Sequence, residues 1–159
     1  MLPTEENDTT KDDERYMKMA LDEARKAFEA GEVPVGCVVV CQHKVIARAH
    51  NLTERLRDFT AHAEMQAFTS AAEYLGGKYL SECTLYVTLE PCMMCAGASF
   101  LTRVKRIVYG ASDFKRGYTL FQQATPKMPL LHPTCEVTTG VLAVECSALL
   151  TSFFRERRD

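Results

Sequence analysis

Apolar residues recur along much of this chain at intervals typical of one face of a helix. Between residues 12 and 30 they fall three or four positions apart, and the pattern ends at Gly31. A period near 3.6 residues predicts an amphipathic helix, and a glycine directly after the last apolar position is a common helix end. The same reasoning predicts helices over 63–75, followed by Gly76-Gly77, and over 142–154.

Other apolar runs are shorter and rich in β-branched residues, which favours strands. Residues 35–40 are almost wholly apolar and predict a central strand of a sheet. Gln42-His43-Lys44 then reverses the chain into a second strand over 45–50. Further strands are predicted over 83–89, 106–109 and 135–138, and a further helix is predicted from Cys92 to about residue 101.

Strands and helices therefore alternate, which predicts an α/β domain of three layers with helices on both faces of one sheet. The first two strands form an antiparallel hairpin, whereas helical crossovers make later strands parallel, so the five-stranded sheet is mixed. Residues 1–11 are polar and acidic and predict a disordered tail before a single domain over 12–159. Residues 111–134 contain three prolines and form a long connection without a clear pattern.

Composition and charge limit the classes of protein that fit. The 159 residues include 47% hydrophobic and 25% charged residues, as expected for one globular domain. No apolar stretch approaches the ~20 residues of a membrane span, and no signal-like pattern stands at the start, so we predict a cytoplasmic protein with no membrane partner. The net charge of −2 argues against a polycationic nucleic-acid binder, although the acidic residues are concentrated before residue 15 and leave a mildly basic body.

Five of the seven cysteines are scattered through apolar segments without the spacing of a disulfide framework. Cysteines of this kind are typical of small buried residues in a reducing compartment. These five are Cys37, Cys41, Cys83, Cys135 and Cys146.

The other two cysteines, Cys92 and Cys95, have the spacing of a metal-binding pair. Two intervening residues at the start of a helix turn both sulfurs to one side, and Pro91 suits the first helical position. The helix dipole and a metal would both favour the thiolate forms. Taken alone, the motif is also consistent with a redox pair, a structural zinc or coincidence.

His62 and Glu64 lie upstream and are two residues apart, which places them roughly 200° apart around a helix. They cannot share a helical face, so the H-E-x-x-H metalloprotease pattern is excluded. They converge only on something beyond the end of the helix, and we predict that the helix starts near His62 and Cys92 face each other across a metal. A lone histidine there is more often a cap or a core residue, but one imidazole with two thiolates leaves a fourth zinc position for water, as in a zinc hydrolase.

His-x-Glu followed by Pro-Cys-x-x-Cys is the signature of zinc-dependent nucleobase deaminases. From about residue 16 to residue 154 the chain resembles the cytidine-deaminase superfamily and, within it, the tRNA-specific adenosine deaminases. The likeness rests on Glu32-Val33-Pro34-Val35-Gly36, Asn51, Thr60-Ala61-His62-Ala63-Glu64, the run from Thr84 to Ala98, and Ala143-Val144-Glu145-Cys146 before a Phe-Phe-Arg helix end.

The resemblance implies a cytidine-deaminase-like fold with one zinc ion per subunit. It also implies a homodimer that converts adenosine to inosine at the wobble position of a tRNA anticodon. The positions it implies are His62, Cys92 and Cys95 for the metal, Glu64 for proton transfer, and Asn51, Ala63 and Asp113 for substrate binding.

Residues 114–121 depart from the family by being bulkier and more aromatic, in a region where the family contacts its substrate. A deaminase of a free base or nucleoside (guanine, cytosine or adenosine) therefore stays open as an alternative. A structural-zinc scaffold or an inactive RNA-binding subunit is a second alternative, although such a subunit is expected to lack the Glu64 carboxylate. The basic residues expected to contact RNA are Lys115, Arg116, Arg155, Arg157 and Arg158.

Overall fold

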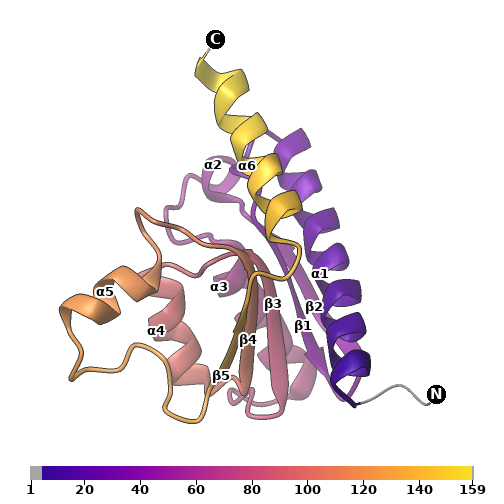
Figure 1. Ribbon diagram of the computed structural model, residues 1–159, viewed down its shortest axis with the longest axis vertical. Helices are drawn as coiled ribbons and strands as arrows, with labels where there is room; N and C mark the ends of the chain where they lie inside the picture. Colours follow the sequence, from indigo (N-terminus) through magenta and orange to yellow (C-terminus); the bar gives the residue numbers. More distant parts are fainter. Residues whose placement is uncertain (1–4, 159) are drawn as a thin grey trace.

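A computed structural model describes residues 5–158 of the chain as one mixed sheet covered by helices on both faces (Figure 1). The strands lie in the order β2-β1-β3-β4-β5. The strands are β1 (Gly36–Cys41), β2 (Lys44–His50), β3 (Cys83–Leu89), β4 (Arg106–Ala111) and β5 (Glu136–Thr139). The helices are α1 (Glu5–Glu29), α2 (Thr53–Leu56), α3 (Ala63–Leu75), α4 (Met93–Thr102), α5 (Tyr118–Ala124) and α6 (Ala143–Arg158).

The sheet pairs its strands as the sequence predicts. β1 is antiparallel to β2 and to β3, whereas β3, β4 and β5 run parallel through helical crossovers. The β1–β2 turn places Gln42 and His43 at φ values of 51° and 62°, as a two-residue turn that follows the twist of a hairpin requires. The predicted three-layer α/β fold with a five-stranded mixed sheet is therefore confirmed.

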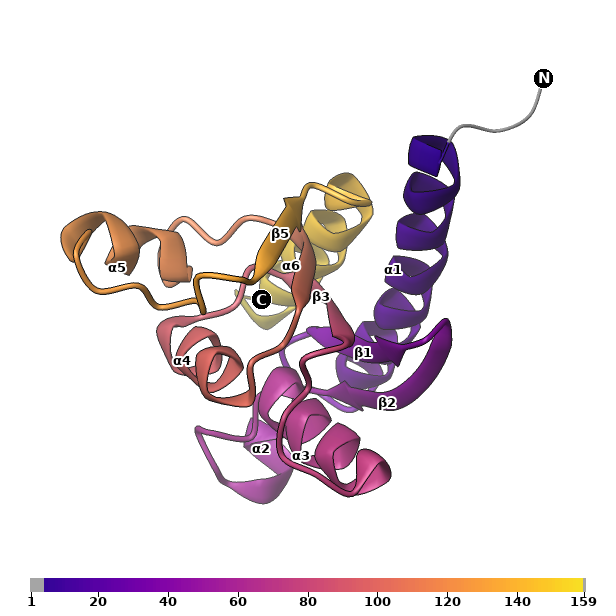
Figure 2. The same ribbon diagram turned by 90° about the horizontal axis from the view of Figure 1, so that it is seen from below.

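Alternate residues of β1 point into two separate cores. Cys37 and Val39 pack beneath α3 and α4, whereas Val38 and Val40 pack beneath α1 and α6. Figure 2 shows the two pairs of helices on opposite faces of the sheet. Gly36 permits the close approach of α1, because a Cβ atom there would lie 2.2 Å from the carbonyl oxygen of Ala20.

The sequence predicted a disordered tail over 1–11, and this prediction is wrong for residues 5–11, because α1 begins at Glu5. Residues 1–4 lie outside the described part of the chain. Asp13 anchors this end of the helix to the sheet. Its buried carboxylate accepts hydrogen bonds from the Tyr86 hydroxyl at 2.9 Å and from both terminal nitrogens of Arg106 at 2.7–2.8 Å. Once a helix is nucleated, each further residue adds one hydrogen bond, so anchoring at Asp13 favours extension toward the N-terminus.

Two short helices lie where no helix is predicted. α2 lies in the predicted loop over 51–60, and α5 lies in the connection over 111–134. In the first turn of α2, two backbone N–H groups donate to the buried Glu32, and in the first turn of α5 one backbone N–H group donates to the buried Glu90; both glutamates come from distant segments. Such long-range capping leaves no periodic pattern in the sequence.

The five cysteines outside the Cys-x-x-Cys motif are free, as predicted. Cys37, Cys83 and Cys146 are buried, while Cys41 and Cys135 are half-buried. Burial raises the pKa of Cys83 and of Cys146 to about 12, which makes both thiols poor nucleophiles at neutral pH. Among the helices of residues 5–158, none is both long enough and apolar enough to cross a membrane.

Candidate metal centre and substrate cavity

Two helix starts carry the candidate metal ligands. His62 is the residue before α3 and Cys92 the residue before α4, and both have extended backbone conformations. Neither side chain caps its own helix by a hydrogen bond, so the capping role that His62 could have played is excluded. Pro91 was predicted at the first helical position of α4. It lies two residues before Met93, where α4 begins, because Cys92 still has an extended backbone.

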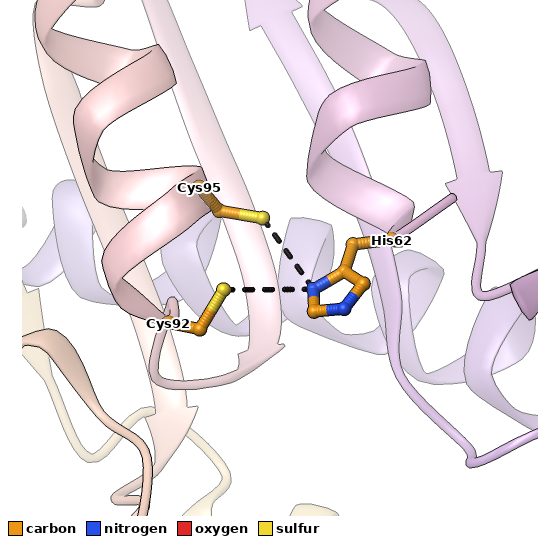
Figure 3. A group of neighbouring side chains, drawn as sticks. All are labelled: His62, Cys92 and Cys95. Atoms are coloured by element: carbon orange, nitrogen blue, oxygen red, sulfur yellow. Dashed lines mark hydrogen bonds between the residues drawn. The ribbon is translucent and has the colours of Figure 1, made fainter. Parts of the chain in front are cut away.

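The three side chains point toward one another across the gap between α3 and α4 (Figure 3). The sulfur atoms of Cys92 and Cys95 each lie 3.6 Å from Nδ1 of His62, and the three donor atoms lie within 4.8 Å of one another. Ligands of a tetrahedral zinc ion, with bonds of about 2.0–2.3 Å, are separated by roughly 3.5–3.8 Å. The donor set therefore fits one tetrahedral metal ion, and the predicted meeting of two helix starts is confirmed.

Hydrogen bonds within this cluster shift the pKa values of all three side chains. Hydrogen bonds from Cys95 and then from His62 lower the pKa of Cys92 to about 4, despite partial burial. The pKa of Cys95 is raised instead, first because its thiol donates to the Cys92 thiolate and then because it is buried. The hydrogen bond to the Cys92 thiolate also raises the pKa of His62. A divalent cation would allow both sulfurs to be thiolates and the imidazole to be neutral.

Glu64 lies in the first turn of α3 and is 3% exposed. Its carboxyl group lies within hydrogen-bonding reach of the Cys95 sulfur, which places it directly beside the donor set. Burial is the main cause that raises its pKa, and hydrogen bonding to its backbone opposes the shift. A buried carboxyl group with a raised pKa at the edge of a cavity is suited to accept and release a proton.

The donor set opens onto a cavity of about 730 Å³ at the carboxyl ends of β3 and β4. This is the edge at which open α/β sheets place their sites. His62, Glu64 and Cys92 line the cavity, and Cys95 lies behind them at 1% exposure. The predicted substrate residues Asn51, Ala63 and Asp113 line the same cavity, as do Lys115 and Arg116.

Asn51 follows the last residue of β2 and is 7% exposed. Its Nδ2 donates to the carbonyl oxygen of Val33 at 3.4 Å, and its Oδ1 accepts from the backbone N–H of Thr53 at 3.2 Å. These two contacts fix the amide at the wall of the cavity. The placement is consistent with a role in holding a polar substrate group.

The five predicted RNA-contact residues fall into different settings. Lys115 and Arg116 lie at the cavity. Asp113 stabilises the turn that carries them, because its Oδ1 accepts from the backbone N–H groups of both residues at 3.0 Å. Arg155 is exposed on α6. Arg157 is already engaged, because it donates to the carbonyl oxygen of Gly31 and its guanidinium lies 4.4 Å from the centre of the Phe153 ring. The side chain of Arg158 lies outside the described part of the structure.

Sequence reasoning missed two kinds of residue at the cavity. Phe59 and Phe154 were not named from the sequence and line the cavity with exposures of 93% and 46%, whereas Phe114, at 85%, belongs to the aromatic segment 114–121 that the sequence already placed near the substrate. A phenylalanine within a polar loop, as Phe59 is, was the available signal. Glu90 also lines the cavity, and its signal was a charged residue at the end of an apolar strand directly before the Pro-Cys motif.

Comparison with known proteins defines the class. The chain matches the model of the MafB19-like deaminase family over residues 11–158. It is 49% identical over 146 residues to the tRNA-specific adenosine deaminase of Bacillus subtilis (strain 168), covering 92% of this chain and 91% of that protein. The chain therefore belongs to the deaminases and, within them, to the family of tRNA-specific adenosine deaminases.

Solved structures agree with this assignment. A tRNA:A34 deaminase that carries out A-to-I editing at the wobble position of transfer RNA is similar with a TM-score of 0.79 and 43% identity, over 86% of this chain and 99% of that one. The guanine deaminase of Nitrosomonas europaea is similar with a TM-score of 0.71 and 25% identity, over 88% of this chain and 83% of that one. The resemblance inferred from the sequence is thus confirmed.

Proposed function

We propose that the chain is a zinc-dependent enzyme that hydrolytically deaminates adenosine to inosine at the wobble position of a tRNA anticodon. The observation that carries this proposal is the buried Glu64 carboxylate beside a His-Cys-Cys donor set on the wall of an open cavity. The substrate is supported by the identity to proteins named as tRNA-specific adenosine deaminases.

The chemistry follows from the placement of Glu64. One zinc ion per subunit, held by His62, Cys92 and Cys95, would lower the pKa of water toward ~7. Glu64 accepts one proton from the attacking water and passes it to the ring nitrogen beside the target carbon, while the water oxygen bonds to that carbon. Glu64 then moves the remaining proton of the former water, now on the hydroxyl group of that carbon, to the amino group; the C–N bond breaks and ammonia leaves. Asn51 orients the base in the cavity.

The rim of the cavity suits an unpaired loop of RNA. Bases in an anticodon loop are already unpaired, so flipping one into a cavity costs a few kcal/mol or less. Phe59 and Phe114 are exposed aromatic rings at the rim and can stack on neighbouring bases. Lys115 and Arg116 lie beside them and complement the phosphate charge.

The proposal is tested by supplying the zinc-loaded protein with tRNA, adenosine, guanine and cytosine in separate reactions and measuring ammonia. We expect ammonia from tRNA alone, with inosine appearing at the first anticodon position. The likeness to a guanine deaminase makes guanine the second candidate substrate. Release of ammonia from guanine and not from tRNA would replace the proposed substrate with that one.

Neutralising the two basic residues of the rim is expected to change how salt affects RNA binding. A variant with Lys115→Gln and Arg116→Gln should flatten the plot of log Kd against log salt by about 0.7 for each phosphate that is no longer neutralised. Fluorescence anisotropy with an anticodon stem-loop RNA measures this slope. Arg157→Gln is the matched control, because Arg157 is committed to Gly31 and Phe153 and its loss should leave the slope unchanged. An unchanged slope in the double variant would remove both residues from the interface.

The same titration separates stacking from charge. Phe114→Ala is expected to weaken binding about tenfold at every salt concentration without changing the slope, since stacking on one base contributes about 1–3 kcal/mol. Binding equal to that of the unaltered protein would exclude Phe114 as a stacking surface.

We also infer that the chain forms a homodimer and acts in the cytoplasm, where tRNA is its macromolecular partner. Apolar side chains are exposed at both ends of α4, with Met93 at 49% and Leu101 at 75%. An exposed apolar helix face is typical of a surface that is covered by a partner. Sedimentation equilibrium should give twice the chain mass, and Leu101→Arg should shift the mass toward that of a single chain. A single-chain mass for the unaltered protein would contradict the dimer.

A further inference from the structure

Glu90 is a buried acid to which the proposed chemistry assigns no task. It follows the last residue of β3, stands two residues before the metal-ligand candidate Cys92, and is 4% exposed. None of the ion pairs found among residues 5–158 includes it. A carboxylate is costly to bury unless hydrogen bonds replace its lost water.

Those hydrogen bonds come from the two ends of one cavity loop. Oε1 of Glu90 accepts from the backbone N–H of Asp113 at 3.2 Å. Oε2 accepts from the backbone N–H of Thr119 at 3.1 Å and from the Thr119 hydroxyl at 2.9 Å. The segment between these donors, residues 114–118, includes Phe114, Lys115 and Arg116 at the cavity. One carboxylate therefore fixes both ends of the segment that forms this part of the rim.

Backbone contacts also connect the same segment to Pro91 and Cys92, which lie between β3 and α4. Cys92 and Gly117 form an isolated antiparallel bridge, and the N–H of Tyr118 donates to the carbonyl oxygen of Pro91 at 2.9 Å. Gly117 also rests against the Glu90 carboxylate, since a Cβ atom at this position would lie 2.0 Å from Oε2. Its φ of −64° is open to any residue, so the demand for glycine here is steric.

We propose that Glu90 is a positioning residue that holds the cavity loop, residues 113–119, in register with Cys92 and thereby sets the affinity of the cavity for the RNA around the target base. This role rests on the proposed function, because it concerns the RNA that the cavity loop contacts. Glu90 acts through the loop and not on the reacting atoms. Its loss therefore affects binding of the substrate more than the chemical step.

Glu90→Gln is the sharpest variant, because it keeps the shape of the side chain but replaces one accepting oxygen with an NH2 group. That group faces either the Asp113 N–H or the two Thr119 donors, and at least one buried donor loses its acceptor. We expect KM for an anticodon stem-loop RNA to rise about tenfold, while kcat falls less than about threefold. Zinc content should stay at one ion per chain.

Gly117→Ala tests the same contact from the other side. The added methyl group would meet the Glu90 carboxylate and also, at 2.6 Å, the backbone carbonyl oxygen of Asp113, so it displaces the same loop and KM should rise as it does in Glu90→Gln. Shortening the acid relieves the first of these two contacts, so the double variant Glu90→Asp with Gly117→Ala should be less impaired than the product of its two single effects. If the KM of the double variant rises by the product of the two single increases, direct contact between the two positions is contradicted.

Asp13→Asn controls for loss of stability alone. Asp13 on α1 is as buried as Glu90, at 4% exposure. Its carboxylate accepts hydrogen bonds from Tyr86 and Arg106, away from the cavity. This variant should lower Tm without changing KM. A merely structural role for Glu90 would give the same pattern, with a lower Tm and an unaltered KM.

Hydrogen exchange gives a readout that does not depend on activity. In the zinc-loaded protein, Glu90→Gln should speed amide exchange over residues 112–119 and leave β1 protected as before. If the unaltered protein deaminates the stem-loop RNA but Glu90→Gln leaves both KM and this exchange unchanged, the positioning role is overturned. If the unaltered protein does not deaminate that RNA, the proposed function fails. In that case, faster exchange in Glu90→Gln still supports the anchoring of the loop by Glu90, and unchanged exchange overturns that anchoring.

Discussion

Glu64→Gln is expected to abolish deamination while zinc stays bound. The amide keeps the size of the side chain in a site that is 3% exposed, but it cannot accept the proton of the attacking water. General acid–base catalysis by one residue contributes about 10²–10⁴-fold, and Glu64 acts in more than one proton transfer, so the upper end of that range is expected. The metal stays because its donor set consists of His62, Cys92 and Cys95 and does not include Glu64.

Single-turnover formation of inosine and zinc analysis by mass spectrometry measure the two effects separately. Glu73→Gln is the matched control, because Glu73 is an exposed acid on the same helix, α3, and its replacement should leave the rate within about twofold. Full activity in Glu64→Gln would show that another group moves the protons.

Cys95→Ser is expected to remove zinc and activity together. Cys95 is 1% exposed and supplies one of the two sulfur atoms of the candidate donor set, and a serine hydroxyl does not replace a thiolate as a zinc ligand. Zinc present at a hundredfold excess over its Kd stabilises the folded protein by about 2.7 kcal/mol, and the variant loses this stabilisation. Thermal unfolding with and without a chelator should therefore differ for the unaltered protein and coincide for the variant.

Cys135→Ser provides the comparison for that experiment. Cys135 is a half-buried free thiol outside the donor set. Its replacement should leave zinc content, activity and the response to chelator unchanged. Retention of one zinc ion per chain in Cys95→Ser would mean that the metal is held elsewhere.

The long elements of the fold could be predicted because their cause lies within each segment. α3 and β1 follow from apolar periodicity and from β-branched runs, and the boundaries differ from the predicted ones by no more than two residues at most ends. α2 and α5 could not be predicted, because their first turns depend on Glu32 and Glu90, which reach them from distant segments. The N-terminal extension of α1 was missed for the same reason, since Asp13 is anchored by residues far along the chain.

The candidate metal-binding cluster was predictable because the spacing of its residues carries the chemistry. His62, Cys92 and Cys95 each stand at a helix start, and a pattern of residue types and turns suffices to bring them together. Surface charge gave a weaker signal. The grouping of arginines on α6 suggested RNA contacts, yet Arg157 is committed to the carbonyl oxygen of Gly31, a pairing that only the packing of α6 against α1 creates.

X-ray absorption at the zinc edge of the purified protein tests the central claim most directly, because it counts the ligands of the metal. We expect one zinc ion per chain with two sulfur ligands at about 2.3 Å and two nitrogen or oxygen ligands at about 2.0–2.1 Å, from His62 and one exchangeable water. Four sulfur ligands, or a shell of oxygen alone, would contradict a catalytic centre built from His62, Cys92 and Cys95.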